Sequence, residues 1–187
     1  RPLPVAVAGG AYVRLGGILY EWNQLHESAQ CANQGIELNR PFQMSGVMFI
    51  GCVVLANILR ARGDLTGAID SLQNAETVVR SSGIHQATLR MVEAARAQLR
   101  LAQRNIADAA QWATAYERDL NFPAGGDWPD ARQLSPIFDY ECLTLARVRM
   151  AQGQWDEALR LLMQLQPVVE AGTRKTGLIE LLALRAL

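Results

Sequence analysis

The chain has 187 residues, with 18 basic and 18 acidic side chains, 50% hydrophobic residues and 6% aromatic residues. This apolar content is too high for a disordered polymer, and the zero formal net charge argues against a bare nucleic-acid-binding surface. Alanine and leucine, both strong helix formers, together make up about 28% of the chain. Composition therefore predicts an all-α protein, of a length that suits one domain or one segment of a longer repetitive array.

The most apolar window, residues 44–59, spans 16 residues and contains Asn57. A bilayer needs roughly 20 apolar residues, so we expect a helix buried on both sides by its neighbours and no membrane contact. The first residues, RPLPVAVAGG, lack the pattern of a signal peptide. The three cysteines are an odd number and lie far apart, so we expect no disulfide framework and a cytoplasmic location.

Four segments share one pattern, in which an apolar helix, a tight polar turn and a second, amphipathic helix follow one another. The first helices are predicted at about 10–20, 44–61, 86–102 and 136–151. The second helices are predicted at about 25–38, 65–81, 106–120 and 155–171, and a ninth helix starts near Thr176. Residues 122–136, rich in glycine and proline, are expected to form a loop between the third and fourth repeats.

The turns define the period of the pattern. The large residues that follow them, spaced by 40, 41 and 49, are Leu25, Leu65, Ile106 and Trp155. The small residues three positions later are Ser28, Ala68, Ala109 and Ala158. A small side chain lets two antiparallel helices approach closely, and we expect the large residue to cap the crevice between them. Gly63 and Gly153 should end their first helices, and Asp64 or Asn105 should cap the second.

Helix pairs of this size cannot bury their apolar faces alone, so successive pairs are expected to stack. The predicted fold is an all-α, right-handed superhelix of stacked antiparallel helix pairs forming one domain over residues 1–187. Its repeats are about 8–40, 43–83, 86–121 and 136–172, with a truncated ninth helix at 174–187. The last helix suggests a fragment of a larger protein. The residues expected to pack on a following repeat are Leu178, Ile179, Leu181, Leu182 and Leu184.

The turn-centred pattern resembles the tetratricopeptide repeat (TPR), although its period exceeds the roughly 34 residues usual there. Longer repeats of this type are typical of MalT-like, LuxR-type ATP-dependent transcriptional regulators. The strings RPLPVAVAGGAYVRLGGILYEWNQL (1–25), LTLARVRMAQGQWDEALRLL (143–162) and TRKTGLIELLALRAL (173–187) are similar to that family's. Arg149 departs from the pattern, which puts an aliphatic residue opposite the turn, and the third repeat conforms weakly. The resemblance implies a TPR-like α-solenoid that senses an effector.

The resemblance also implies modules outside this chain. Such regulators bind ATP in an amino-terminal P-loop module and read DNA through a carboxy-terminal helix-turn-helix. The chain contains no GxxxxGK(S/T), so ATP is expected only in the full-length protein and no cofactor is expected here. No nucleophile–base pair or metal cluster can be assembled, so we do not expect an enzyme. The expected partners are a small-molecule inducer or a peptide, and other domains of the same polypeptide.

The first helices of such an array line its concave side, where side chains of successive repeats converge. The positions predicted to face this groove are Tyr20, Glu21, Asn57, Arg60, Gln98, Tyr140 and Arg147. Aromatic faces and fork-shaped donors suit a sugar or a carboxylate. For these residues, the alternative is that Arg and Tyr only tie neighbouring repeats together. For the function, the alternative is a protein–protein scaffold without a small-molecule ligand. A closed pocket bounded by Tyr140 and Arg147 would favour the sensor, and a broad open groove the scaffold.

Other chemically reactive side chains have simpler interpretations. Cys52 and Cys142 occupy similar places in their first helices and should pack as small hydrophobic residues. His26 and His85 are expected to be ordinary surface or turn residues. The carboxylates expected on the outer, solvated face are Asp108, Asp119, Asp156 and Glu157. In the 122–136 loop, Phe122, Asp127, Trp128 and Asp130 could form a lid or partner contact, unless the loop folds back and buries Trp128 against the fourth repeat.

Overall fold

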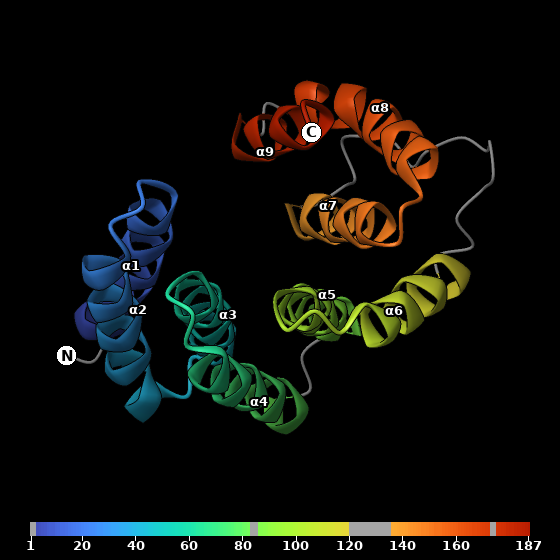
Figure 1. The fold of residues 1–187 in the computed structure, drawn as a ribbon. Helices are drawn as coiled ribbons and strands as arrows, with labels where there is room; N and C mark the ends of the chain where they lie inside the picture. Colours follow the sequence, from blue (N-terminus) through green and yellow to red (C-terminus); the bar gives the residue numbers. More distant parts are fainter. Residues whose placement is uncertain (1–2, 83–85, 120–135, 173–174) are drawn as a thin grey trace. The chain divides into compact units, whose positions relative to one another are not determined.

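The computed structural model describes residues 3–82, 86–119, 136–172 and 175–187. Over these residues the protein is all-α, with nine α-helices, one 3-10 turn and no strand (Figure 1). The first repeat consists of α1 (Leu3–Glu21) and α2 (Leu25–Asn39), followed by the turn η1 (Arg40–Phe42). The later elements are α3 (Ser45–Ala61), α4 (Leu65–Ser82), α5 (Gln86–Ala102), α6 (Ile106–Asp119), α7 (Pro136–Ala151), α8 (Trp155–Ala171) and α9 (Lys175–Arg185).

The predicted helices are confirmed in number, order and type, and most of their ends agree within two residues. The exception is α1, which begins at Leu3 and not near residue 10. Gly9 and Gly10 therefore lie inside this helix. Gly9 is buried there, and a Cβ atom at this position would clash with the side chain of Asn39 in α2. Only glycine fits here without a shift, because the two helices approach closely at this point.

The four turns share one hydrogen-bonding pattern. The central residue of each turn has a positive φ: 58° at Asn23, 80° at Gly63, 60° at Arg104 and 76° at Gly153. Its N–H donates to the carbonyl three residues earlier at 2.9–3.0 Å, and the next N–H donates to the carbonyl five residues earlier at 2.8–2.9 Å. This is the Schellman arrangement that ends a helix and satisfies its last carbonyls. The predicted helix-stopping roles of Gly63 and Gly153 are confirmed.

Two of the second helices have the predicted side-chain caps. The Oδ1 atom of Asp64 accepts a hydrogen bond from the N–H of Gly67 at 2.9 Å. In the same way, Oδ1 of Asn105 accepts from the N–H of Asp108 at 3.2 Å. The corresponding residues Gln24 and Gln154 make no side-chain cap. The fourth repeat instead has Asp156 and Glu157 in the first turn of α8, where carboxylates interact favourably with the helix dipole.

The small residues after the turns are confirmed as close-packing positions. Ser28, Ala68, Ala109 and Ala158 are each at most 2% exposed. The expected capping role of the large residue is wrong in two repeats, because Ile106 is 40% and Trp155 is 56% exposed. Leu25 is half-buried because it packs against a cluster that includes Ile58 of α3. In the first repeat, this position is therefore covered in part by the following repeat.

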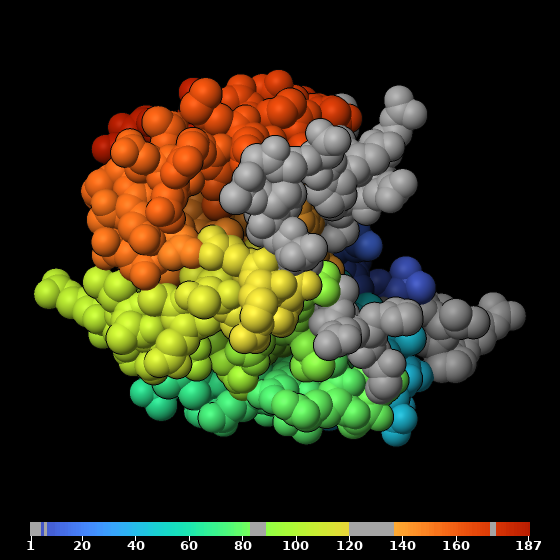
Figure 2. Space-filling view, turned by 90° about the vertical axis from the view of Figure 1, so that its right-hand side faces the viewer, coloured from blue at the N-terminus to red at the C-terminus, as the bar shows by residue number. Residues whose placement is uncertain are grey.

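The chain folds as two compact units, residues 1–99 and 100–187, with the boundary inside α5. In the first unit, the core of α1–α4 includes Val13, Ala32, Val53, Ile58, Leu72 and Val79. In the second unit, the core includes Ala113, Leu143, Leu145, Leu162, Leu165 and Leu181. Figure 2 shows α6 (yellow), α7 and α8 (orange) of the second unit in space-filling form. One continuous domain with a right-handed superhelix stays a prediction.

From the sequence, one apolar segment is expected to be buried and another to form an uncovered surface. The window 44–59 forms most of α3, where Phe49, Val53 and Ile58 are buried. The expected burial on both sides is wrong for Met44 and Ile50, which are 44% and 46% exposed. Among the described helices, none is both long and apolar enough to span a bilayer. In α9 the expectation of five surface leucines and isoleucines is wrong for Leu181 and Leu184, which are 0% and 8% exposed. These two side chains lie on the face of α9 that contacts α7 and α8.

Candidate functional site

The predicted groove residues recur at fixed distances from the turns. Asn57, Gln98 and Arg147 each lie six residues before the positive-φ residue of their repeat. Tyr20 and Arg60 each lie three residues before it. Because the first helices have the same relation to their turns, residues with the same count lie on equivalent faces of these helices. The sequence therefore places polar side chains on one face of successive first helices.

The first unit holds five of the seven predicted residues. Tyr20 is half-buried and packs against the cluster of Ala29, Ala32 and Ile58. Glu21 is exposed, Asn57 is half-buried and Gln98 is only 5% exposed. These four residues thus range from exposed to buried, whereas residues that line one open groove would be similarly accessible.

Arg60 has a buried donor. Its side chain is half-buried on the last turn of α3, and its Nε atom is inaccessible to solvent. This Nε finds no hydrogen-bond acceptor among the described residues. A buried donor without an acceptor costs about 1–3 kcal/mol, so a ligand acceptor that reached Nε after the covering side chains shifted would stabilise this position. Arg60 is therefore the predicted site residue whose local chemistry most favours ligand contact.

The second unit holds Tyr140 and Arg147, both half-buried on α7. The backbone carbonyl of Tyr140 accepts a hydrogen bond from the hydroxyl of Thr144 at 2.7 Å. Arg147 forms an ion pair with Glu180 of α9, and the two side chains are 30% and 32% exposed. Arg147 thus joins the fourth repeat to the next helix, as the alternative interpretation of the sequence expected. Convergence of all seven residues in one groove stays a prediction, since they divide between the two units.

A buried polar cluster lies beside Tyr140 in sequence and was not predicted. The hydroxyl of Tyr116 in α6 donates to Oε2 of Glu141 in α7 at 3.0 Å, and it lies 3.9 Å from Sγ of Cys142. The ring of Tyr116 stacks on that of Trp112, with centroids 5.2 Å apart. Glu141 is 1% exposed. The signal available in the sequence was a carboxylate inside the otherwise apolar stretch YECLTLA of a first helix.

Burial raises the pKa of Tyr116 and of both buried cysteines. It raises the pKa of the Tyr116 hydroxyl well above its ordinary range, helped by the neighbouring Cys142 and Glu141. Burial likewise raises the pKa of the Cys142 thiol and brings that of Cys52 to about 11. The cysteines are 0% and 5% exposed. Both thiols therefore stay protonated and pack as small hydrophobic residues, as predicted.

Arg149 joins three helices at the turn of the fourth repeat. Its guanidinium pairs with Glu117 of α6 and donates to Oε1 of both Gln152 and Gln154 at 3.0 Å. Oε2 of Glu157 in α8 lies 3.7 Å from its Nε. The side chain is only 13% exposed. The aliphatic residue expected at this position is thus replaced by an ion pair that fills the same space between helices.

The remaining candidates stay near the surface or outside the described residues. Asp119, Asp156 and Glu157 are exposed as predicted, whereas Asp108 is half-buried and accepts from Nδ2 of Asn105 at 2.8 Å. His26 is exposed, with Nε2 3.1 Å from Nε2 of Gln30. Within the described ranges, no three His, Cys, Asp or Glu side chains form a group able to hold a metal ion. His85 and the loop with Phe122, Asp127, Trp128 and Asp130 lie outside the described residues.

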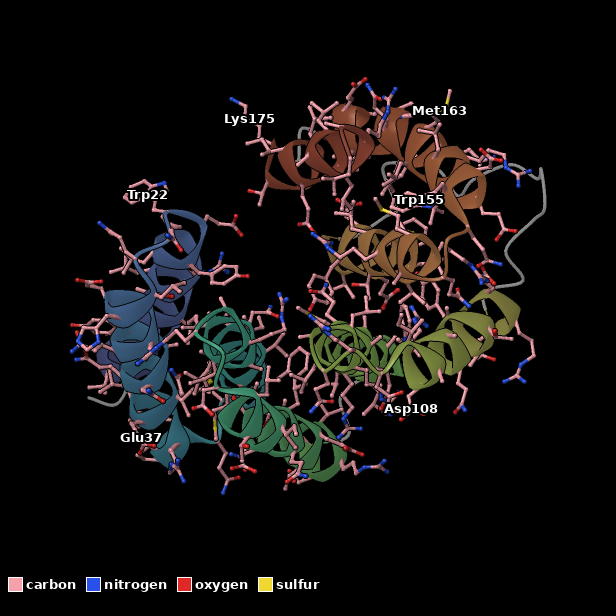
Figure 3. All side chains as sticks on the ribbon, in the orientation of Figure 1. Trp22, Glu37, Asp108, Trp155, Met163 and Lys175 are labelled. Carbon is pink, nitrogen blue, oxygen red and sulfur yellow. The ribbon has the colours of Figure 1, made fainter. Side chains whose placement is uncertain are left out.

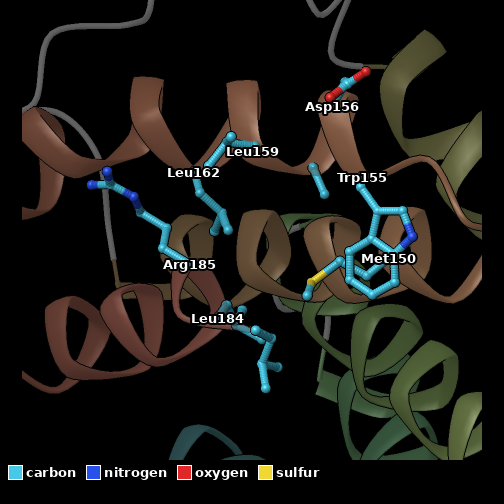
Figure 4. Close-up of a pocket in the computed structure, with 9 residues that line it drawn as sticks. Met150, Trp155, Asp156, Leu159, Leu162, Leu184 and Arg185 are labelled. Carbon is cyan, nitrogen blue, oxygen red and sulfur yellow. The ribbon is translucent and has the colours of Figure 1, made fainter.

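The second unit contains an open pocket of about 330 Å³ between α7, α8 and α9 (Figure 4). Its apolar lining includes Met150, Trp155, Leu159, Leu162 and Leu184. Asp156 and Arg185 also line it, and none of the seven predicted groove residues does. Counted from the turn, four lining residues of α7 and α8 have equivalents in the first repeat. Met150, Trp155, Leu159 and Leu162 correspond to Tyr20, Leu25, Ala29 and Ala32, in that order. In that repeat they pack on α3, so this pocket is a surface for repeat packing.

The comparison with protein families agrees with this repeat geometry. Residues 2–187 match the family model described as the MalT-like TPR region, which covers nearly the whole chain. No curated protein matches the chain. The match and the recurrent turns point to the same repeat type.

Proposed function

Because the chain belongs to the MalT-like TPR family, we propose that it senses an effector for a multidomain transcriptional regulator. The effector is a small polar molecule bound by the first helices, near Arg60. TPR-type helical arrays act as interaction regions, so binding and not catalysis is the expected activity. The buried Nε of Arg60 without an acceptor is the observation that carries the ligand proposal.

The chemistry of Arg60 selects the ligand class. A guanidinium donates several hydrogen bonds in one plane, which suits a carboxylate or the vicinal hydroxyls of a sugar. Tyr20 occupies the same position of the preceding first helix, but its ring packs against Ala29, Ala32 and Ile58, so only the part left accessible there can meet a ligand. Asn57 lies one helical turn before Arg60 on α3. A small ligand with oxygen acceptors and one apolar face is therefore the class we propose.

Signal transfer requires that the ligand prefer one state of the regulator. Binding that only filled a groove equally well in both states would shift no equilibrium. The ATP-binding and DNA-reading modules that the family resemblance implies lie outside this chain. We propose that ligand contact with the first helices changes how the repeats pack, and so biases the contacts of the array with those modules.

Calorimetric titration of the chain with oligosaccharides and with small carboxylates tests this proposal. Arg60→Met keeps the stem of the side chain and removes the donors, so the Kd should rise at least about tenfold. Arg62→Met is the matched control, because Arg62 is exposed two residues further on and should leave Kd within about twofold. Two outcomes would contradict a sensor site at Arg60. In the first, Arg60→Met binds the ligand as tightly as the unsubstituted chain; in the second, neither oligosaccharides nor small carboxylates bind the unsubstituted chain.

The second candidate function is a protein–protein scaffold. Its specific support is the exposure of large apolar side chains, above all Trp22, which is 70% exposed and projects from the turn after α1 (Figure 3). Large exposed apolar patches mark protein–protein interaction sites as well as ligand-binding grooves. One comparison distinguishes the two functions. Substitution of Trp22 should lower the affinity for a protein partner and leave the affinity for a small ligand unchanged.

A further inference from the structure

The helix α9 is held to the second unit by few buried side chains. Of its 11 residues, Leu181 and Leu184 are buried, whereas α8 buries six of its 17 residues. The apolar residues Ile179 and Leu182 are 70% and 46% exposed. Because so little apolar surface is covered, polar contacts with α7 and α8 contribute a large share of the stability of the docked helix.

Polar contacts join α9 to both of its neighbours. Arg147 of α7 forms an ion pair with Glu180, and Arg185 donates to Oε1 of Gln166 in α8. The side chains of Arg147 and Glu180 are 30% and 32% exposed. Their ion pair is therefore buried enough to strengthen the docking of α9, and open enough for a dissolved ion to reach it.

Arg147 has donors to spare, unlike Arg149 on the same helix. Arg149 is 13% exposed and meets two carboxylates and two amide oxygens. Arg147 instead donates from one nitrogen, Nη1, to Glu180. A guanidinium has five N–H donors and binds a carboxylate best through two parallel hydrogen bonds. A dissolved carboxylate can therefore make a two-point contact with Arg147 that Glu180 does not make.

We propose that the Arg147–Glu180 ion pair is a latch on α9, which a small carboxylate ligand opens by replacing the Glu180 carboxylate on Arg147. The ion pair itself shows which chemistry this guanidinium accepts. With Arg147 occupied, α9 keeps its leucine contacts but loses the ion pair, so it undocks more often. By linkage, the ligand favours undocking by the same factor by which loss of Glu180 strengthens ligand binding. Arg147 lies in the second unit, so the inference does not depend on Arg60.

Hydrogen exchange of the α9 amides during a titration with malonate tests the inference, with the α8 amides as the internal reference. Potassium chloride holds the ionic strength constant, because salt alone weakens an exposed ion pair. Saturating malonate should speed exchange in α9 about threefold, which is the effect expected from losing a partly exposed ion pair. Malonamide has a similar shape without the charges and should leave the exchange rate unchanged. An α9 exchange rate that ignores malonate, or responds equally to malonamide, would overturn the inference.

Substitutions distinguish a latch from a merely structural contact. Glu180→Gln should speed α9 exchange about threefold without ligand, abolish the further response to malonate, and lower the Kd for malonate by the same factor. Asp119→Asn is the matched control, because it removes the same charge from an exposed side chain on α6 and should change none of these quantities. An unchanged Kd in Glu180→Gln contradicts the latch.

Two arginine variants complete the test. Arg147→Met removes the donors, so the exchange rate of α9 should no longer depend on malonate even if Glu180→Gln does not fold. A malonate response that persists in Arg147→Met places the ligand elsewhere and overturns the inference. Arg60→Met should leave the response of α9 unchanged, so failure of the site at Arg60 and failure of the latch give different results.

Discussion

At the scale of single residues, the four turns differ in the residue that occupies the left-handed position. Two turns use glycine at the left-handed position, whereas Asn23 and Arg104 adopt φ of 58° and 60° with a side chain present. A left-handed backbone costs about 1 kcal/mol or more for a residue with a Cβ atom, although asparagine tolerates it better. Arg104 therefore holds a conformation that glycine would adopt more easily.

Replacing the turn residues should change stability in opposite directions. Arg104→Gly should raise the free energy of unfolding by about 0.5–1 kcal/mol, and Gly63→Ala should lower it by about 1 kcal/mol. Urea denaturation measures both. Gly46→Ala is the control, because Gly46 lies in α3 with an ordinary φ and open space where a Cβ atom would stand. A loss of stability in Arg104→Gly would show that the arginine side chain makes a favourable contact that outweighs its backbone cost.

At the scale of helices, the packing of α1 on α2 depends on absent side chains. A Cβ atom at Gly35 would lie 2.7 Å from the carbonyl oxygen of Gly9 and 2.9 Å from the N–H nitrogen of Val13. Both are backbone atoms and cannot rotate away. Gly17 lies on the same α1 with nothing within 4 Å of the corresponding position.

These two glycines form a matched pair for mutation. Gly35→Ala should lower the free energy of unfolding by about 2–3 kcal/mol, because α1 and α2 must separate. Gly17→Ala should raise it by up to about 1 kcal/mol, since alanine favours the helix and meets no neighbour. Chemical denaturation monitored by circular dichroism distinguishes the outcomes. A tolerated Gly35→Ala would show that α1 and α2 can move apart at little cost.

The ion pair of Arg149 with Glu117 connects α7 to α6. Removing only the arginine leaves a partly buried carboxylate without its partner, so Arg149→Met should cost about 1–3 kcal/mol. Adding Glu117→Met should recover part of this loss, because both charges are then gone and an apolar contact can replace them. A double-mutant cycle measures the coupling energy. If the two changes in the free energy of unfolding simply add, the two charges contribute nothing to stability, and only the aliphatic parts of the side chains do.

At the scale of the whole molecule, stability in acid reports on the carboxylates paired in the folded state. Hydrogen bonds from Arg80 and Arg96 hold the pKa of Glu76 below its ordinary value of 4.5. The folded state therefore favours the ionised form. This contribution is complete above the unfolded pKa of about 4.5 and is lost as pH falls through the lower folded pKa.

Substitution of Glu76 should remove this contribution. Glu76→Gln should lower the free energy of unfolding at pH 7 by up to about 1 kcal/mol and flatten its decline below about pH 4.5. Glu37→Gln is the control, because Glu37 and its partner Arg40 are both 64% exposed and their pair should contribute little. Urea midpoints between pH 3 and 7 provide the test. An unchanged acid profile in Glu76→Gln would contradict the assigned role of the arginines.

Much of this molecule could be predicted from recurrence in the sequence. The period of large and small residues placed every turn, and the glycines and capping residues placed most helix ends, because these signals act within about ten residues of the chain. The equivalence of Asn57, Gln98 and Arg147 also follows from counting. Their differing burial does not, because it depends on side chains from helices far away in sequence.

The sequence alone determined the all-α class, the helix pairs and the positions of close packing, since helix formation and turn chemistry are local. Only the tertiary structure decided which apolar residues are covered. It buried Leu181 and Leu184, left Ile106 and Trp155 exposed, and put a buried Glu141 beside Tyr116. Periodicity identifies an apolar face, but whether that face meets another helix or water depends on which neighbouring repeat is present to pack against it.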